Sequence, residues 1–280
     1  YQREPKGLAH AILVAEEFID DEEFVMYLGD NILKDGIIEH AQKFKELSPD
    51  SLILLTEVEE PQRFGVAELD ENNSVKRLVE KPRVPPSNYA LVGIYFFKPI
   101  IIEACKNIKP SWRNELEITD AIQWLIDNNY RVEHRIISGW WKDTGKPRDL
   151  LEALYLILDT IEEDINGEIE SSAEVFGRVH IGTGTKIHEN TIIRGPVYIG
   201  KNCEIGPDTF IGPYTSIEDG VKISGGEILS SLVMNNAHIE LGEDTRIIDS
   251  IIGTNAIVKK KTSKKKGLRL ILGETSIVEL

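Results

Sequence analysis

The feature that most constrains the fold is a six-residue repeat of isoleucine in the second half of the chain. Isoleucine recurs without a gap at every sixth position, and glycine directly follows four members of the series. The series is Ile181, Ile187, Ile193, Ile199, Ile205, Ile211, Ile217 and Ile223. Apolar residues repeat at about 3.6 positions in an amphipathic helix and at two in a half-buried strand, so neither produces this spacing. A short fixed repeat with one inward apolar residue is typical of a β-solenoid.

The repeat resembles the hexapeptide repeat of left-handed parallel β-helices. It slips after Leu229, and we expect it to resume with inward side chains at four further positions, Val233, Ile239, Ile251 and Ile257. We therefore predict a left-handed parallel β-helix over residues 166–280, ending in a C-terminal tail. The lysine-rich run at residues 259–266 is interpreted as a solvated connector.

The first half of the chain alternates between strand-like and helix-like segments. Apolar or β-rich runs predict strands at residues 24–29, 52–58, 65–69, 75–79, 90–97 and 131–137. Helical apolar spacing predicts helices at residues 7–19, 36–47, 99–108, 116–128 and 147–160. Buried strands separated by helices favour a parallel α/β sheet covered on both faces. We predict such an α/β domain over residues 1–165.

Composition limits the location and the partners of the chain. There are 32 Lys and Arg against 47 Asp and Glu, a net charge of −15, and so acidic a surface repels the phosphates of nucleic acids. Any nucleotide must then be held by a local site. Cys105 and Cys203 lie far apart, which predicts reduced, buried thiols in a cytoplasmic protein. No apolar run approaches the roughly 18 residues of a membrane span, so we expect no membrane partner.

Five segments of the first half, in this order, resemble glucose-1-phosphate thymidylyltransferases. They are Gly7-Leu8-Ala9-His10-Ala11, Leu28-Gly29-Asp30-Asn31, Glu80-Lys81-Pro82, Glu115-Leu116-Glu117-Ile118-Thr119-Asp120 and Trp140-Trp141-Lys142-Asp143-Thr144-Gly145. With the β-helix added, the chain is similar to the long form of that family. The resemblance implies a Rossmann-like nucleotidyltransferase domain. The family's first strand and its glycine-rich, arginine-containing loop would lie before Tyr1, so we expect this domain to be N-terminally incomplete as given.

The resemblance implies a magnesium-dependent enzyme that condenses dTTP, a nucleoside triphosphate, with glucose-1-phosphate, a sugar-1-phosphate, to give dTDP-glucose and pyrophosphate. Its metal ligands would be Asp30 and Asp143, each at the end of a strand-like run. Carboxylates suit Mg²⁺, which prefers hard oxygen ligands. The alternative is that each aspartate caps a turn or helix, as this residue type often does.

The other implied catalytic residues are Lys81 and Arg113, which would fix the sugar phosphate. Glu80 would accept hydrogen bonds from sugar hydroxyls, as an ionised carboxylate can. The alternative for Glu80 and Lys81 is an ordinary surface ion pair. Further implied substrate-binding residues are Gln2 and Gly7 at the base, Gly65, Leu91, Gly93 and Tyr95 at the sugar, and Glu115 as an orienting group. Gly65 could equally be a turn glycine, and Leu91 and Tyr95 plain strand residues.

Three alternative functions remain open at this point. The nearest is a UDP-, ADP- or GDP-sugar pyrophosphorylase, which would keep the reaction and change the nucleotide. The second is an acetyltransferase that uses the β-helix, and the third is a non-catalytic subunit for assembly. In each case the flat apolar faces of a solenoid predict a homo-oligomer, because such faces invite pairing with a neighbour.

Overall fold

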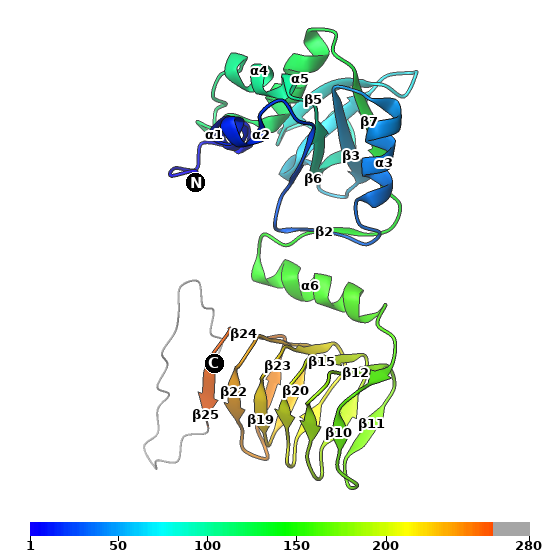
Figure 1. The fold of residues 1–280 in the computed structure, drawn as a ribbon, viewed down its shortest axis with the longest axis vertical. Helices are drawn as coiled ribbons and strands as arrows, with labels where there is room; N and C mark the ends of the chain where they lie inside the picture. The colour runs from blue at the N-terminus through cyan, green and yellow to red at the C-terminus, as the bar shows by residue number, and fades with distance from the viewer. Residues whose placement is uncertain (260–280) are drawn as a thin grey trace. The chain divides into compact units, whose positions relative to one another are not determined.

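The computed structural model of the chain describes residues 1–259, and it divides into two compact units (Figure 1). The first unit is Tyr1–Leu150 and the second begins at Leu151. The predicted C-terminal tail and all but the first lysine of the basic run lie outside the described residues. The domain boundary expected at residue 165 stays a prediction. Within residues 1–259 no helix combines the length and the apolar character needed to cross a bilayer.

A six-stranded sheet forms the centre of the first unit. Its main path is β5 (Val75–Glu80), β4 (Gly65–Leu69), β6 (Tyr89–Phe97), β3 (Ser51–Glu57) and β7 (Val132–Ile136), with β1 (Phe24–Tyr27) also paired to β6. The prediction of a parallel sheet is wrong, because most of the strand pairs are antiparallel. β3 and β7 run parallel, whereas β6 is antiparallel to β1, β3 and β4, and β4 is antiparallel to β5. Apolar runs indicate burial but carry no information on strand direction.

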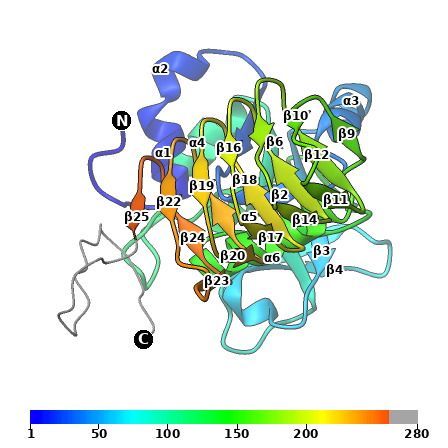
Figure 2. The same cartoon turned by 90° about the horizontal axis from the view of Figure 1, so that it is seen from below.

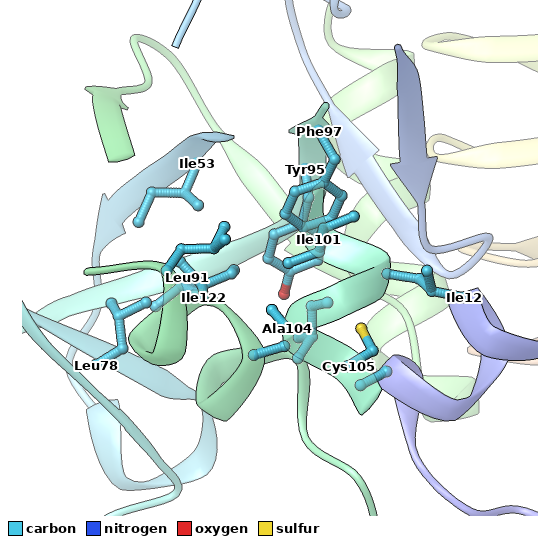
Figure 3. Close-up of a cluster of buried hydrophobic side chains, with 14 of the residues drawn as sticks. Ile12, Ile53, Leu78, Leu91, Tyr95, Phe97, Ile101, Ala104, Cys105 and Ile122 are labelled. Carbon is cyan, nitrogen blue, oxygen red and sulfur yellow. The ribbon is translucent and has the colours of Figure 1, made fainter. Parts of the chain in front are cut away.

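Helices cover both faces of this sheet, as predicted. On one face, α1 (Leu8–Val14), α2 (Glu16–Ile19), α4 (Ile100–Asn107) and α5 (Ile118–Asp127) pack on alternate residues of β3 and β6, including Ile53, Tyr95 and Phe97 (Figure 3). On the other face, α3 (Ile38–Leu47) packs on Leu52, Leu54 and other intervening residues. Because both faces are buried, β3 and β6 appear in the sequence as continuous apolar runs rather than as alternating ones.

A small antiparallel pair, β2 (Asn31–Leu33) with β8 (Trp141–Asp143), lies apart from the main sheet. The first predicted strand is shorter than expected, because β1 ends at Tyr27 and the chain turns before β2 begins. The pairing places Asn31 opposite Asp143. Two motifs that are far apart in the sequence thus meet at one end of a three-residue ladder.

The second unit is a parallel β-helix built from three sheets (Figure 2). Each strand pairs in parallel with the strand three further along the chain, so that Ile205 lies between Ile187 and Ile223. All eight isoleucines of the predicted series are at most 2% exposed, which confirms the six-residue register. The handedness stays a prediction.

The strands of the β-helix are short. The first sheet holds β9 (Asp164–Ile165), β12 (Val179–Ile181), β15 (Val197–Ile199), β18 (Thr215–Ile217), β21 (Leu232–Val233) and β24 (Ile251–Ile252). The second holds β10 (Glu168–Ile169), β13 (Lys186–Ile187), β16 (Glu204–Ile205), β19 (Lys222–Ser224), β22 (His238–Glu240) and β25 (Ile257–Lys259). The third holds β11 (Glu174–Phe176), β14 (Ile192–Arg194), β17 (Phe210–Ile211), β20 (Glu227–Leu229) and β23 (Arg246–Ile248).

The later part of the register was predicted wrongly at two positions. Val233 and Ile239 are fully buried as expected. Their neighbours in the next coil, however, are Ile252 and Val258, one residue beyond the predicted Ile251 and Ile257. Ile257 is 68% exposed. The reason is a change in turn length that a fixed period cannot follow.

The first change in turn length comes at Gly225 and Gly226. Both have positive φ, 68° and 67°, a conformation that other residues adopt only with strain. This tight turn shortens the spacing from six positions to five, from the inward Ile223 to the inward Ile228. A longer turn then follows Ile239, so the next inward isoleucine in sequence is Ile247.

Helix α6 (Pro147–Leu158), which begins with a proline as predicted, ends against the β-helix. The Tyr155 hydroxyl donates a hydrogen bond to Asp249 Oδ1 (3.0 Å), and the Tyr155 ring lies 5.1 Å from the ring of Tyr214. Beyond the helix, Asp159 accepts hydrogen bonds from the Tyr214 hydroxyl (3.1 Å) and from Arg178. The C-terminal half of α6 is therefore tied to several coils of the second unit.

Candidate active site

A cavity of about 290 Å³ opens in the first unit, near the lower end of the range for small-molecule sites. Strands β4, β5, β6 and β8, together with the segment before α5, supply its walls. Nine of the residues predicted for the site line it, namely Gly65, Glu80, Lys81, Leu91, Gly93, Tyr95, Arg113, Glu115 and Asp143. The structure therefore brings together residues from three of the five motifs, from strands β4 and β6, and from the segment that holds Arg113.

Arg113 is enclosed by carboxylates. Its Nη1 lies 3.5 Å from Glu80 Oε1 and 3.4 Å from Glu117 Oε1, and its Nη2 lies 3.0 Å from Glu115 Oε1. Three acidic side chains thus share one guanidinium. Because a guanidinium carries five N–H donors, these three contacts leave donors with which Arg113 can also bind a phosphate.

Glu80 is a half-buried carboxylate with a perturbed charge state. Its Oε2 accepts a hydrogen bond from the Thr119 hydroxyl (3.2 Å), and Lys81 Nζ lies 4.0 Å from its Oε1. Burial raises the pKa of Glu80, the charge of Glu117 raises it further, and Lys81, Thr119 and Arg113 act in the opposite direction. The carboxyl is therefore less acidic than an exposed glutamate.

Gly65 packs directly against this carboxylate. A Cβ added at Gly65 would lie 2.6 Å from the Thr119 methyl group and 3.1 Å from Glu80 Oε2. Its backbone is not in the left-handed region, so the requirement for glycine is one of space. The structure favours close approach over the alternative of a plain turn glycine.

Asn31 organises the wall of the cavity and was not predicted as a site residue. It is 7% exposed, and its Nδ2 donates to Asp30 Oδ1 (2.8 Å). Its Oδ1 accepts hydrogen bonds from the Gly93 N–H (3.2 Å) and from the Trp141 indole Nε1–H (2.7 Å). One side-chain amide therefore links Asp30 to β6 and to β8. Its place beside Asp30 in a motif was the signal that could have identified it.

Asp30 and Asp143 lie at the same end of the β2–β8 pair. The backbone N–H and the hydroxyl of Thr144 both donate to the Asp30 carbonyl oxygen at 2.7 Å. Asp143 lines the cavity, whereas Asp30 is exposed beside it. Burial raises the pKa of Asp143, and the charge of Asp30 raises it further, so the two carboxylates are close enough to repel each other.

The donor set at this point suits a hard divalent cation. Asp30 and Asp143 supply two carboxylate groups, and Mg²⁺ commonly binds proteins through one or two carboxylates plus phosphate oxygens and waters. Among residues 1–259 no group of three or more His, Cys, Asp or Glu side chains is arranged to hold a metal ion by itself. A metal here would need further ligands from a bound phosphate.

Gln2 and Gly7 are joined to each other but do not line the cavity. Gln2 Nε2 donates to the Gly7 carbonyl oxygen (3.0 Å) and lies 2.9 Å from His10 Nδ1. Gly7 has φ 96°, and a Cβ there would lie 2.3 Å from the Leu116 carbonyl oxygen. Leu8, the next residue, does line the cavity. The two residues therefore lie beside the site, and their role at the base stays a prediction.

Several lining residues were missed as site residues in the sequence. They are Leu8, Leu28, Asn31, Arg63, Phe64, Glu117, Ile118 and Trp141. Glu117 and Trp141 lie inside quoted motifs, so their position was a usable signal. Arg63 had none, because it reaches the site from a 3-10 helix, η1 (Pro61–Arg63), in a loop.

Comparison with known proteins gives a consistent result for both units. The profile of the nucleotidyl transferase family matches residues 1–160, and that of the GMPPB C-terminal domain matches residues 187–279. The chain is 44% identical over 280 residues to the glucose-1-phosphate thymidylyltransferase of Streptomyces antibioticus, and it is 41% identical over 280 residues to the low-salt glycan biosynthesis nucleotidyltransferase Agl11 of Haloferax volcanii. Each match covers 100% of this chain and 78% of the relative.

A solved structure of a UDP-glucose pyrophosphorylase, complexed with UDP-glucose, superposes with a TM-score of 0.50 at 31% sequence identity. This match covers 54% of the present chain and 62% of the other.

Proposed function

The chain belongs to the nucleotidyl transferase family, and from this premise we propose that it condenses dTTP with glucose-1-phosphate to give dTDP-glucose and pyrophosphate. The observation that carries the proposal is the convergence of nine predicted site residues, four of them from the quoted motifs, on one cavity. The 44% identity to a thymidylyltransferase over the whole chain supports the choice of nucleotide and sugar.

In the proposed reaction an oxygen of the sugar phosphate attacks the α-phosphorus of dTTP in line. The new P–O bond forms as the bond to the leaving pyrophosphate breaks. Such a transfer needs little covalent help from the protein, because positioning and stabilisation of charge supply most of the catalysis. The side chains of this site are of the types that such a role requires.

The sugar phosphate would be held by Lys81 and Arg113. An ammonium and a guanidinium can both neutralise phosphate, and the guanidinium can bind it through two parallel hydrogen bonds. Glu80, when ionised, would accept hydrogen bonds from the sugar hydroxyls. Gly65, Gly93, Leu91 and Tyr95 would form the wall against the ring. Glu115, at 3.0 Å from Arg113 Nη2, would orient the guanidinium.

We assign the metal to Asp30 and Asp143, which Asn31 and Thr144 support from behind. When bound, Mg²⁺ would offset the charge that gathers on the phosphates. For the base, Gln2 offers both a donor and an acceptor to a pyrimidine edge, and Gly7 offers its backbone. Gln2 is hydrogen-bonded to Gly7, and Gly7 directly precedes Leu8, which lines the cavity.

We further propose that the enzyme acts in the cytoplasm as a homo-oligomer. Both cysteines are unpaired and buried, which suits a reducing compartment. The β-helix leaves large apolar side chains on its surface, including Phe176 (48% exposed) and Ile248 (46% exposed), and such groups favour association with a second copy.

A panel of four nucleoside triphosphates with glucose-1-phosphate and Mg²⁺ tests the proposal, with pyrophosphate release as the measurement. We expect dTTP to give the highest kcat/KM. Preference for UTP would instead favour the uridylyl alternative, and consumption of acetyl-CoA with an amino-sugar phosphate would favour acetyl transfer. If the chain neither converts nor binds any of these substrates, the result would favour the alternative of a non-catalytic assembly subunit.

Asp143→Asn tests the metal site within the same assay. It removes one carboxylate charge with little change in shape, and we expect turnover to be lost while circular dichroism is unchanged. Asp244→Asn, at an exposed position of the β-helix, is the matched control and should retain full activity. Normal kcat for Asp143→Asn at saturating Mg²⁺ would remove Asp143 from the metal site.

A further inference from the structure

Glu117 is a buried carboxylate at the inner wall of the cavity. It is 4% exposed and directly precedes α5. At such a position a side chain often caps the helix, but the Glu117 side chain makes no capping hydrogen bond. A buried charge that neither caps a helix nor reaches water requires partners elsewhere.

The partners of Glu117 are Ser111 and Arg113, and together they restrain both the backbone and the side chain of Arg113. The Ser111 hydroxyl donates to Glu117 Oε1 (2.7 Å) and accepts a hydrogen bond from the Arg113 backbone N–H (3.1 Å). The Arg113 guanidinium also contacts Glu117 Oε1 directly, at 3.4 Å. Through Ser111 and through the guanidinium, Glu117 therefore restrains both the backbone and the tip of one arginine.

The same arginine nitrogen lies between two carboxylates. Arg113 Nη1 is 3.4 Å from Glu117 and 3.5 Å from Glu80, and Glu80 is the residue assigned to the sugar hydroxyls. With the negative charge of Glu117 present, the guanidinium is shared between the two. Without it, Arg113 would be free to turn fully onto Glu80 and Glu115.

We propose that Glu117 is a positioning residue. It holds the Arg113 guanidinium in place for the sugar phosphate, and it keeps Arg113 from pairing fully with Glu80, which would block the carboxylate assigned to the sugar hydroxyls. The inference rests on the proposed function, because it assigns Glu80 and Arg113 to the sugar-1-phosphate. The role it adds is exercised through Arg113 and Ser111.

The proposal has a consequence for the pH dependence of binding. Glu80 faces the carboxylate of Glu117, the cations of Lys81 and Arg113 and the hydroxyl of Thr119, and the phenol of Tyr95 is also near it. The charge of Glu117 is one of the causes that raise the pKa of Glu80. Removing this charge should therefore keep Glu80 ionised, and able to accept hydroxyl hydrogen bonds, down to a lower pH.

The test is the affinity for glucose-1-phosphate, measured by calorimetry from pH 4.5 to pH 8 with the full chain. Glu117→Gln keeps the shape and the acceptor for Ser111 but loses the charge. At pH 8 we expect roughly tenfold weaker binding, the size of one charged hydrogen bond. We also expect the acidic midpoint of binding to move to lower pH. The phosphate itself titrates in this range, but equally in every variant.

Two further variants separate positioning from a merely structural role. Glu115→Gln also loses a charge next to Arg113, yet Glu115 is not among the groups that shift the pKa of Glu80, so its acidic midpoint should match wild type. Ser111→Ala breaks the link to the Arg113 backbone and should weaken binding without moving the midpoint. It also provides a test should Glu117→Gln fold poorly.

The outcomes are distinct. A lower midpoint in Glu117→Gln alone supports the proposal. An unchanged midpoint in that variant, or an unchanged affinity in both Glu117→Gln and Ser111→Ala, overturns it. If wild type itself does not bind glucose-1-phosphate, the proposed function fails, which is a different result from a wild type that binds and variants that behave like it.

Discussion

Replacing Gly182 by alanine should destabilise the β-helix selectively. Gly182 lies where one coil stacks on the next, and its N–H donates to the Ile199 carbonyl oxygen at 2.9 Å. A Cβ at this position would lie 2.7 Å from the carbonyl carbon and oxygen of Gly200 and 2.9 Å from the N of Lys201. All three atoms belong to backbone, so no side chain can rotate away to make room.

The size of the effect follows from these distances. Ordinary contact begins near 3.4 Å, so the two coils must separate by about 0.7 Å at this point. The same movement would stretch the 2.9 Å hydrogen bond to about 3.6 Å, beyond its useful range. Overpacking costs about 1–3 kcal/mol and a lost hydrogen bond about 1 kcal/mol. We expect the unfolding free energy of the second unit to fall by roughly 2–4 kcal/mol.

The control is Gly253→Ala in the same β-helix, where an added Cβ meets nothing within 4 Å. This variant should be unchanged, or slightly more stable because the unfolded chain loses freedom. Urea unfolding followed by far-ultraviolet circular dichroism reports on both units. Tryptophan fluorescence reports on the first, because all four tryptophans precede residue 151. Equal dichroism midpoints for the two variants would refute the packing argument.

Three further predictions concern the first unit. Gly65→Ala should raise the KM for glucose-1-phosphate by roughly tenfold or more, because the new methyl group displaces Thr119 and Glu80, and an unchanged KM would contradict the close approach. The folded pKa of Glu80 is raised, so its contribution to stability is present below the unfolded pKa and is lost as the pH rises through the folded value. Glu80→Gln should therefore unfold at a higher urea concentration than wild type at pH 7.5, but not at pH 4. A variant less stable than wild type at pH 7.5 would contradict this prediction. Burial raises the pKa of Cys105 to about 12, so iodoacetamide at pH 8 should leave this thiol unmodified until urea unfolds the domain. Mass spectrometry measures the labelling, and rapid modification of the native protein would contradict the burial of Cys105.

The β-helix could be predicted from sequence because one apolar residue in six must point inward, and that period belongs to few folds. The register failed where glycine shortened a turn, at Gly225 and Gly226, since a fixed count cannot anticipate a change in turn length. In the first unit the burial of β3 and β6 was evident from their apolar runs. Their direction was not, because direction depends on where the connecting segments return.

The cavity was predictable to the extent that its residues lie in motifs. Asp143, Glu80 and Lys81 could be identified by such local patterns. Asn31 could not be assigned its contacts to Gly93 and Trp141, because those contacts join segments that are distant in the sequence. Arg113 was assigned to a phosphate, although two of the three carboxylates that share it, Glu115 and Glu117, lie only two and four residues away in the sequence.

The short ladder between β2 and β8 has a consequence for the order in which the protein matures. It closes a loop that contains most of the first unit, and closing so long a loop is slow compared with forming helices or hairpins. During synthesis Asp30 leaves the ribosome well before Asp143 exists. Until then the two proposed metal ligands cannot meet, and proteolysis between the two strands leaves them on separate polypeptides.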